Sequence, residues 1–242
     1  MFLWRLPITS TKASLQSRRH WGMARIPPHN LYWGAAFGVR TFFRHSADWK
    51  EVLRVQNPYK GALERVAFQH RTHHVVLVAD AYQGSEIKQA LTGFFQTAAG
   101  VNVHMGEPKG CVGGGSACCS PDDADLVVYV GHDGLIDFSL PLEFPNPTGA
   151  SKSFFKDLLH KTGAEPLLWT TGLMTPEAYA LKAAMDGWVL GETTEQIRER
   201  AAEAYSKYQK CGRGLTAFLR FLVSAGGLPG ASGACAELTL LG

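Results

Sequence analysis

The sequence has no apolar run close to the about 18 residues that a membrane-spanning helix needs. It also has little excess charge: a formal net charge of +3 favours neither nucleic acid nor a membrane surface as a partner. The five cysteines are an odd number in a chain of medium length, so they give no disulfide framework and favour a reducing compartment. Because the rest of the composition is that of an ordinary globular protein, we predict a cytoplasmic location.

Acidic residues are absent from positions 1–47, where arginine recurs. Such a start resembles an organellar presequence in composition, and the plainer alternatives are a disordered basic tail or a true start at Met23. We favour the tail. With no internal repeat, a chain of 242 residues suits one sizeable domain. We therefore predict a basic, disordered tail over 1–29, a single α/β domain over 30–225 and a loosely ordered, glycine-rich tail over 226–242.

The most informative stretch runs from Asp125 to Phe138. Its residues Leu126–Val130 are apolar without a break, which is typical of a strand buried on both faces inside a parallel sheet. Directly after them come a glycine, His132, Asp133 and a second glycine. Sites in open α/β sheets form where strands end, so His132 is the first candidate for a functional side chain. The alternative is a histidine that only satisfies loop backbone between two glycines.

The rest of the pattern predicts strands and helices in alternation, as an α/β domain requires. Four helix starts carry capping signals: Ser85, Ser151, Thr175 before a proline, and Thr193 with Gln196 as a capping box. The predicted strands lie near 30–39, 75–79, 126–130 and 166–170, and the predicted helices near 48–55, 87–99, 152–161, 176–190, 193–211 and 215–224.

Polar residues follow three of these strands, and right-handed connections are expected to bring the strand ends to one rim of the sheet. Such a rim is a plausible binding pocket. Besides the histidine loop, its binding candidates are Asp80, Tyr82, Thr170 and Thr171. The simpler interpretation is that the aspartate forms a turn and that the threonines supply turn hydroxyls.

The segment Val127-Val-Tyr-Val-Gly-His132-Asp-Gly134 resembles the strand and Gly-His-Gly element of the caspase-like cysteine peptidases, which include caspases, metacaspases, legumains, gingipains and separases. The order of elements over about 30–185 is similar as well. The resemblance implies a three-layer α/β sandwich with a mostly parallel central sheet in caspase-like order, followed by helical C-terminal additions. It also implies that the histidine works with a cysteine at the end of the next strand in acyl transfer.

The sequence departs from that family at the expected catalytic residues. Asp133 is an extra residue between the histidine and the second glycine, and the first cysteine after His132 is Cys211. At the expected place of the nucleophile stands Thr148-Gly-Ala-Ser151. A cysteine peptidase needs its thiolate. The catalytic candidates are therefore His132, Asp133 and Ser151, with Thr148 as the other substitute.

The missing cysteine favours a degenerate caspase-like domain that is a non-catalytic binding module using the rim around His132. The alternative is a cysteine-peptidase-like hydrolase with His132 as general base and a substituted nucleophile. Metal-assisted hydrolysis by His132, Asp133 and Asp80 ranks last, because aspartates commonly form turns. We predict an unknown protein or peptide ligand as partner, and neither nucleic acid nor a membrane.

Two other clusters raise the question of a metal. His70, His73 and His74 lack a helical frame and a nearby thiol or carboxylate, and the cysteines within 110–121 match no common zinc spacing. The glycines of 110–121 precede a strand instead of following one, so a phosphate loop is disfavoured as well. We therefore predict no metal and no cofactor, and we interpret 110–121 as a surface insertion.

Overall fold

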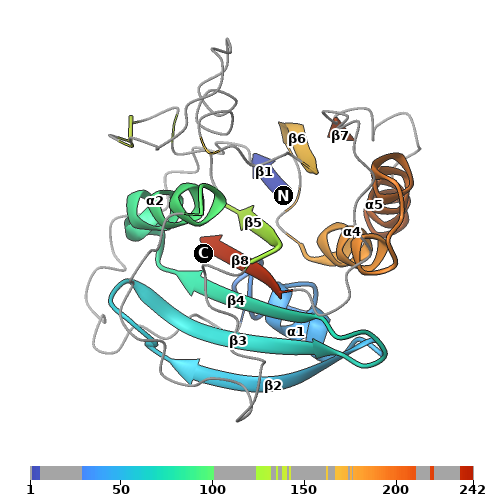
Figure 1. Ribbon diagram of the computed structural model, residues 1–242, viewed down its shortest axis with the longest axis horizontal. Coiled ribbons are helices and arrows are strands. Elements are labelled where there is room, and N and C mark those ends of the chain that lie inside the picture. The colour runs from blue at the N-terminus through green and yellow to red at the C-terminus, as the bar shows by residue number, and fades with distance from the viewer. Residues whose placement is uncertain are drawn as a thin grey trace.

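The described residues of the computed structural model form one sheet of eight strands with helices on both faces (Figure 1). The strand order is β2-β3-β4-β8-β5-β1-β6-β7. The strands are β1 (Phe2–Arg5), β2 (Trp49–Gln56), β3 (Ala62–His70), β4 (Val76–Tyr82), β5 (Leu126–Val130), β6 (Leu168–Leu173), β7 (Leu219–Arg220) and β8 (Cys235–Leu241). The helices are α1 (Val39–Arg44), the short 3-10 helix η1 (Gly84–Glu86), α2 (Ile87–Ala98), α4 (Tyr179–Val189) and α5 (Thr194–Gln209). The structure describes residues 2–5, 29–100, 124–131, 135, 138–140, 142, 162, 167–173, 175, 177–210, 219–220 and 235–241.

The predicted fold class is wrong, because the sheet is mixed: an antiparallel unit of three strands and a further antiparallel pair flank its parallel strands. The strands β2, β3 and β4 form an antiparallel unit in chain order, and β6 pairs antiparallel with β7. The pairs β4–β8, β8–β5, β5–β1 and β1–β6 are parallel. Short connections explain the antiparallel unit, since residues 57–61 and 71–75 reverse the chain as hairpins, which join only antiparallel strands.

Two segments at the start of the domain also differ from their prediction. Residues 48–55 were expected to form a helix, but most of them belong to strand β2. Residues 30–39 were expected to form a strand, but they turn, because the Asn30 side-chain oxygen accepts hydrogen bonds from the backbone N–H groups of Tyr32 and Trp33 at 3.0 and 3.1 Å. The turn is tight: a Cβ on Gly38 would lie 2.4 Å from the Trp33 carbonyl carbon.

Strands from both predicted tails take part in the sheet. β8 lies between β4 and β5, and β1 lies between β5 and β6. Neither strand was predicted, and β7 lies where the sequence predicted a helix over 215–224. The helices α4 and α5 are therefore followed by strands, and are not additions at the C-terminal end of the domain. The domain boundaries themselves stay a prediction.

Several local predictions agree with the structure. Strand β5 has the predicted bounds and is buried throughout, and helix α2 lies where helical periodicity placed it. The predicted capping box at the start of α5 is present: the Thr193 hydroxyl accepts from the Gln196 backbone N–H at 3.3 Å, and the Thr193 N–H donates to the Gln196 side chain at 2.8 Å. The predicted caps Ser85 and Thr175 are absent, because α2 follows Glu86 and α4 follows Ala178 without side-chain capping. The predicted cap Ser151 lies outside the described residues.

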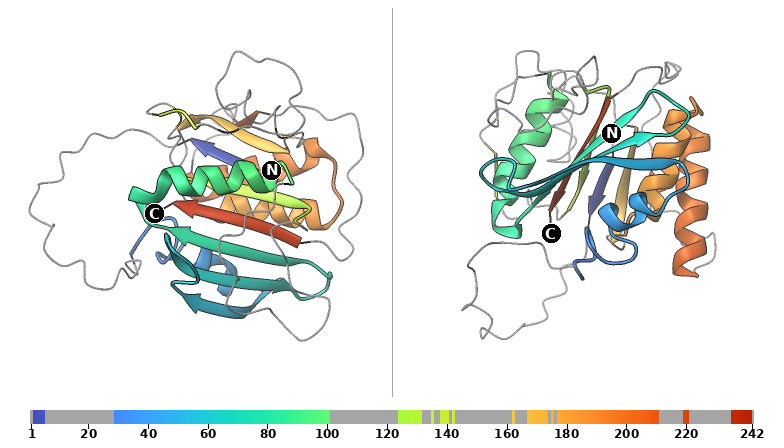
Figure 2. Two further views of the ribbon diagram at one scale, coloured as in Figure 1. Left: turned by 60° about the vertical axis from the view of Figure 1, so that its left-hand side comes forward. Right: turned by 90° about the horizontal axis from the view of Figure 1, so that it is seen from below.

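The core has two parts. Helix α2 covers one face of the sheet, and α1, α4 and α5 cover the other (Figure 2). Strand β5 contributes to both parts, because successive side chains of a strand point to opposite faces. Its Val128 packs in the cluster that includes α1, α4 and α5, whereas its Tyr129 packs against Phe94 and Phe95 of α2. Within the part of the chain that the structure describes, no helix is both long and apolar enough to cross a membrane.

The turn between β3 and β4 depends on a neutral histidine. The Nδ1 atom of His70 accepts hydrogen bonds from the backbone N–H groups of Thr72 and His73, at 3.3 and 3.2 Å. Burial and, second, the His73 ring lower the pKa of His70 below its ordinary value of 6.5, while the carboxylates of Asp48 and Asp186 act in the opposite direction. A protonated Nδ1 is unable to accept these two bonds.

We therefore expect the free energy of unfolding to depend on the charge of His70. Because the folded pKa lies below the unfolded pKa, this contribution is complete above about pH 6.5 and is lost as the pH falls through and below that value. His70→Asn keeps a side-chain acceptor that does not titrate. Urea unfolding from pH 7.5 to 5 should show a weaker pH dependence for His70→Asn than for the wild type and for the exposed control His74→Asn. Equal pH dependence in all three would contradict this role.

Candidate functional site

Three charged residues are buried in the described part of the chain: Glu64, Arg65 and Asp80. Glu64 and Arg65 are consecutive on β3, so their side chains point to opposite faces of the sheet. Asp80 lies on the neighbouring strand β4, directly opposite Arg65. Burial of a charge is costly unless partners satisfy it, so the contacts of these residues constrain the structure around them.

Arg65 and Asp80 form a bidentate ion pair inside the sheet. The Arg65 Nε and Nη2 atoms donate to the two Asp80 carboxylate oxygens at 2.7 and 2.5 Å. The Tyr59 hydroxyl donates to Asp80 Oδ2 at 2.6 Å and lies 2.7 Å from the Tyr82 hydroxyl. The Arg65 guanidinium also lies over the Tyr59 ring, 5.3 Å from its centroid. These contacts fasten Tyr59, which belongs to the loop between β2 and β3, to the core.

The Tyr59 phenol is a fixed hydrogen-bond donor. Burial, followed by the nearby Asp80 and Tyr82, raises the pKa of Tyr59 well above its ordinary value of 10. The hydroxyl therefore keeps its proton at neutral pH and does not serve as a base there.

Glu64 makes the corresponding attachment on the other face. Its carboxylate accepts from the Trp33 indole N–H, from Arg40 at 3.0 Å and from the Gln56 side chain at 2.6 Å. Trp33 lies in the tight turn before α1, and Arg40 lies in α1 itself. The turn and the helix are thus held to β3 by one carboxylate.

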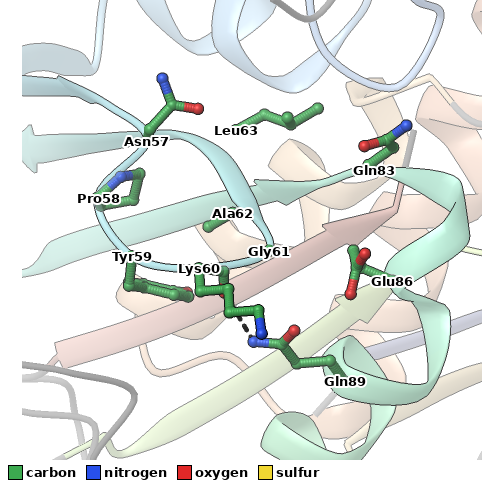
Figure 3. Close-up of a pocket in the computed structure, with 10 residues that line it drawn as sticks. All are labelled: Asn57, Pro58, Tyr59, Lys60, Gly61, Ala62, Leu63, Gln83, Glu86 and Gln89. Atoms are coloured by element: carbon green, nitrogen blue, oxygen red, sulfur yellow. Dashed lines mark hydrogen bonds between the residues drawn. The ribbon is translucent and has the colours of Figure 1, made fainter. Parts of the chain in front are cut away.

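A cavity of about 780 Å³ lies at the carboxyl end of β4, which is within the usual size of a small-molecule site (Figure 3). The β2–β3 loop forms one wall, and the segment that leads from β4 into α2 forms the other. The described residues that line the cavity are Asn57, Pro58, Tyr59, Lys60, Gly61, Ala62, Leu63, Gln83, Glu86 and Gln89.

The loop wall is held at two consecutive residues, Tyr59 and Lys60. Tyr59 is held by the ion pair described above, and the Gln89 side-chain N–H donates to the Lys60 carbonyl at 2.8 Å, which joins the loop to α2. Gly61 is required at the contact: its φ is +92°, in the region that favours glycine, and a Cβ there would lie 2.5 Å from Gln89 Oε1. The cavity is therefore preformed.

The described lining is mostly polar and lacks the side chains of a nucleophilic catalyst. It contains three side-chain amides, one lysine and one glutamate, but no serine, threonine, cysteine or histidine among the residues that the structure describes. A nucleophile with an adjacent base, as acyl transfer requires, is therefore missing from the described wall.

The structure brings together only part of the predicted rim. Asp80 and Tyr82 meet through the Tyr59 hydroxyl, but both are buried in β4 and neither lines the cavity. The backbone of Thr170 and Thr171 lies in β6, which is separated from β5 by β1. The predicted catalytic residues His132, Asp133 and Ser151 lie outside the described residues, as does Thr148.

Sequence reasoning missed the residues that build the cavity, notably Tyr59, Lys60 and Gln89. The only local signals were Asn57-Pro58 and Gly61, which mark a turn without indicating its neighbours. His70, His73 and His74 were considered as metal ligands and disfavoured. Among the residues with a described placement, no group of three or more metal-ligating side chains occurs.

A second cavity, of about 410 Å³, lies between α1 and the α4–α5 pair. Its half-buried cation is already paired: the Lys182 ammonium group lies 2.8 Å from Asp48 Oδ2 and 2.6 Å from Asp186 Oδ2. An aromatic wall that includes Tyr179 and Tyr208, stacked at 4.6 Å between ring centroids, closes one side.

Searches with protein-family models, curated protein sequences and solved structures found no match to this chain.

The contribution of the Arg65–Asp80 ion pair to stability can be tested by substitution. Asp80→Ala should destabilise the protein by roughly 3–5 kcal/mol, because the Arg65 guanidinium is then buried without a counter-charge. The double variant Arg65→Met/Asp80→Leu removes both charges and should be clearly more stable than Asp80→Ala. Urea unfolding measures both. A loss below about 1 kcal/mol for Asp80→Ala, the usual range of an exposed pair, would contradict a structural role for this ion pair.

Proposed function

We propose that this protein is a binding module whose ligand site lies at the carboxyl end of β4 and extends toward His132. One observation carries the proposal: polar side chains from the β2–β3 loop and from the start of α2 surround a preformed cavity whose described lining has no nucleophile. A fixed cavity of this kind favours binding, because little conformational freedom is lost when a ligand enters.

The parallel strands support a common edge for the cavity and the histidine loop. Tyr82 at the end of β4 pairs with Leu241, and Val130 at the end of β5 pairs with Leu240. With neighbouring strands about 4.8 Å apart, the ends of β4 and β5 are separated by about 10 Å. His132 follows Val130 by two positions in the sequence. The sequence predicts the binding rim around His132 for this same edge, and we propose that it belongs to the ligand site.

The ligand class fits the expectation of a peptide or protein segment better than that of nucleic acid, because the described wall has only one cationic side chain, Lys60. We further propose a cytoplasmic location, on the grounds of cysteine number. A relationship to the caspase-like peptidases stays a proposal that rests on residues 127–134. The binding role does not require it.

The second candidate function is acyl-transfer hydrolysis, with His132 as general base and Ser151 or Thr148 as nucleophile. The sequence motif favours it, and the described cavity does not. Fluorophosphonate and acyloxymethyl-ketone probes distinguish the two functions, since they label activated hydroxyls and thiols. We expect no labelling of the wild type and normal folding of His132→Ala. Labelling that disappears in His132→Ala would replace the binding proposal.

A cavity-filling variant tests the binding proposal. Gln83 lines the cavity, whereas Gln69 is exposed on β3 outside it, so Gln83→Trp and Gln69→Trp form a matched pair. Saturation-transfer NMR with a panel of amino acids, dipeptides, sugars, nucleosides and inorganic phosphate should yield compounds that bind the wild type and Gln69→Trp but not Gln83→Trp. Binding that Gln83→Trp leaves unchanged throughout the panel would refute the site.

A further inference from the structure

We propose that the cavity takes a zwitterionic ligand, a free amino acid or a short peptide with unblocked termini. The ligand ammonium group would pair with Glu86, and its carboxylate would pair with Lys60. The inference rests on the proposed binding function and adds the chemical class of the ligand.

The charges of the cavity wall carry this inference. Lys60 comes from the β2–β3 loop and Glu86 comes from η1, so the two charges enter the cavity from opposite walls (Figure 3). Among the described residues, neither side chain has a hydrogen-bonded or ion-paired partner. Two opposite, unpaired charges facing one cavity are complementary to a ligand that carries both signs.

Charged groups elsewhere in the described chain are commonly paired. Arg40 contacts Glu64, and Arg54 contacts Glu51 at 2.7 Å. In the second cavity, the carboxylates of two aspartates neutralise Lys182. At the large cavity, by contrast, the exposed Lys60 and the half-buried Glu86 line one space without a described partner.

Other ligand classes fit this wall less well. A phosphate or a dicarboxylate would face the Glu86 carboxylate, and a diamine would face Lys60, so each would meet a like charge. A neutral sugar would displace water from both charges without pairing either of them. The side-chain amides of Gln83 and Gln89 offer donors and acceptors, which suit the amide or polar side chain of an amino acid or peptide.

The test compares one amino acid with two derivatives that each lack one charge. Calorimetry would measure binding of glutamine, Nα-acetylglutamine, glutamine amide, diglycine and glucose to the full chain. We expect glutamine or diglycine to bind, and their relative affinity distinguishes an amino acid from a peptide. Both blocked derivatives should bind at least about tenfold more weakly, as expected for the loss of one charge-assisted contact.

Substitutions of Lys60 and Glu86 test which charge of the ligand each side chain contacts. Lys60→Met should weaken glutamine binding but leave glutamine amide unchanged, since that probe has no carboxylate. Glu86→Gln should weaken glutamine binding but leave Nα-acetylglutamine unchanged. Lys50→Met on β2 and Glu199→Gln on α5 are exposed controls outside the cavity and should bind like the wild type.

The outcomes separate this inference from the proposed function. Equal binding of glutamine and its blocked derivatives would overturn the proposal that the ligand is a zwitterion. So would binding of glucose or phosphate alone, but if that binding is lost in Gln83→Trp, the cavity remains the binding site. If no probe distinguishes Gln83→Trp from Gln69→Trp, both proposals fail.

Discussion

The structure depends on two buried charges that are neighbours in the sequence and point to opposite faces of one strand. On one face, Glu64 accepts hydrogen bonds from Trp33 and Arg40, which holds the tight turn and α1 to the sheet. On the other, Arg65 pairs with Asp80 across to β4. An unpaired buried charge is far more costly than a lost surface contact, so both sets of partners are constrained together. One dipeptide of β3 therefore fixes structure on both sides of the sheet.

The candidate site follows from this constraint. Tyr59 donates to the paired Asp80, so the loop that carries Tyr59 is held at the end of β4, where it becomes a wall of the cavity. The described buried charges Glu64, Arg65 and Asp80 all have partners, whereas at the cavity Lys60 and Glu86 have none among the described residues. In the proposed binding role, the paired charges hold the cavity wall and the unpaired charges recognise the ligand. This division of roles favours binding over catalysis in the described wall.

The sequence correctly predicted those features of the structure that are determined by a few neighbouring residues. The apolar run of β5 and the capping box of Thr193 are encoded within a few residues, and the structure agrees with both. The sheet order was not predictable in this way, because the position of β8 beside β4 depends on a partner far away in the chain. Asp80 gives a second example. Its charge interrupts the apolar pattern, so the predicted strand ended before it, yet β4 continues through Asp80 because Arg65 neutralises the charge. No motif marks the cavity.

The most direct test of this account is amide hydrogen exchange in Tyr59→Phe, which removes one hydroxyl and keeps the ring. Two backbone hydrogen bonds report on the loop, from the Asn57 N–H to Leu63 O at 2.9 Å and from the Ala62 N–H to Tyr59 O at 3.2 Å. We predict faster exchange at these two amides, with unchanged exchange in β5 and no effect of the exposed control Tyr208→Phe. Unchanged exchange at Asn57 and Ala62 in Tyr59→Phe would contradict the claim that the buried ion pair holds the cavity wall in place.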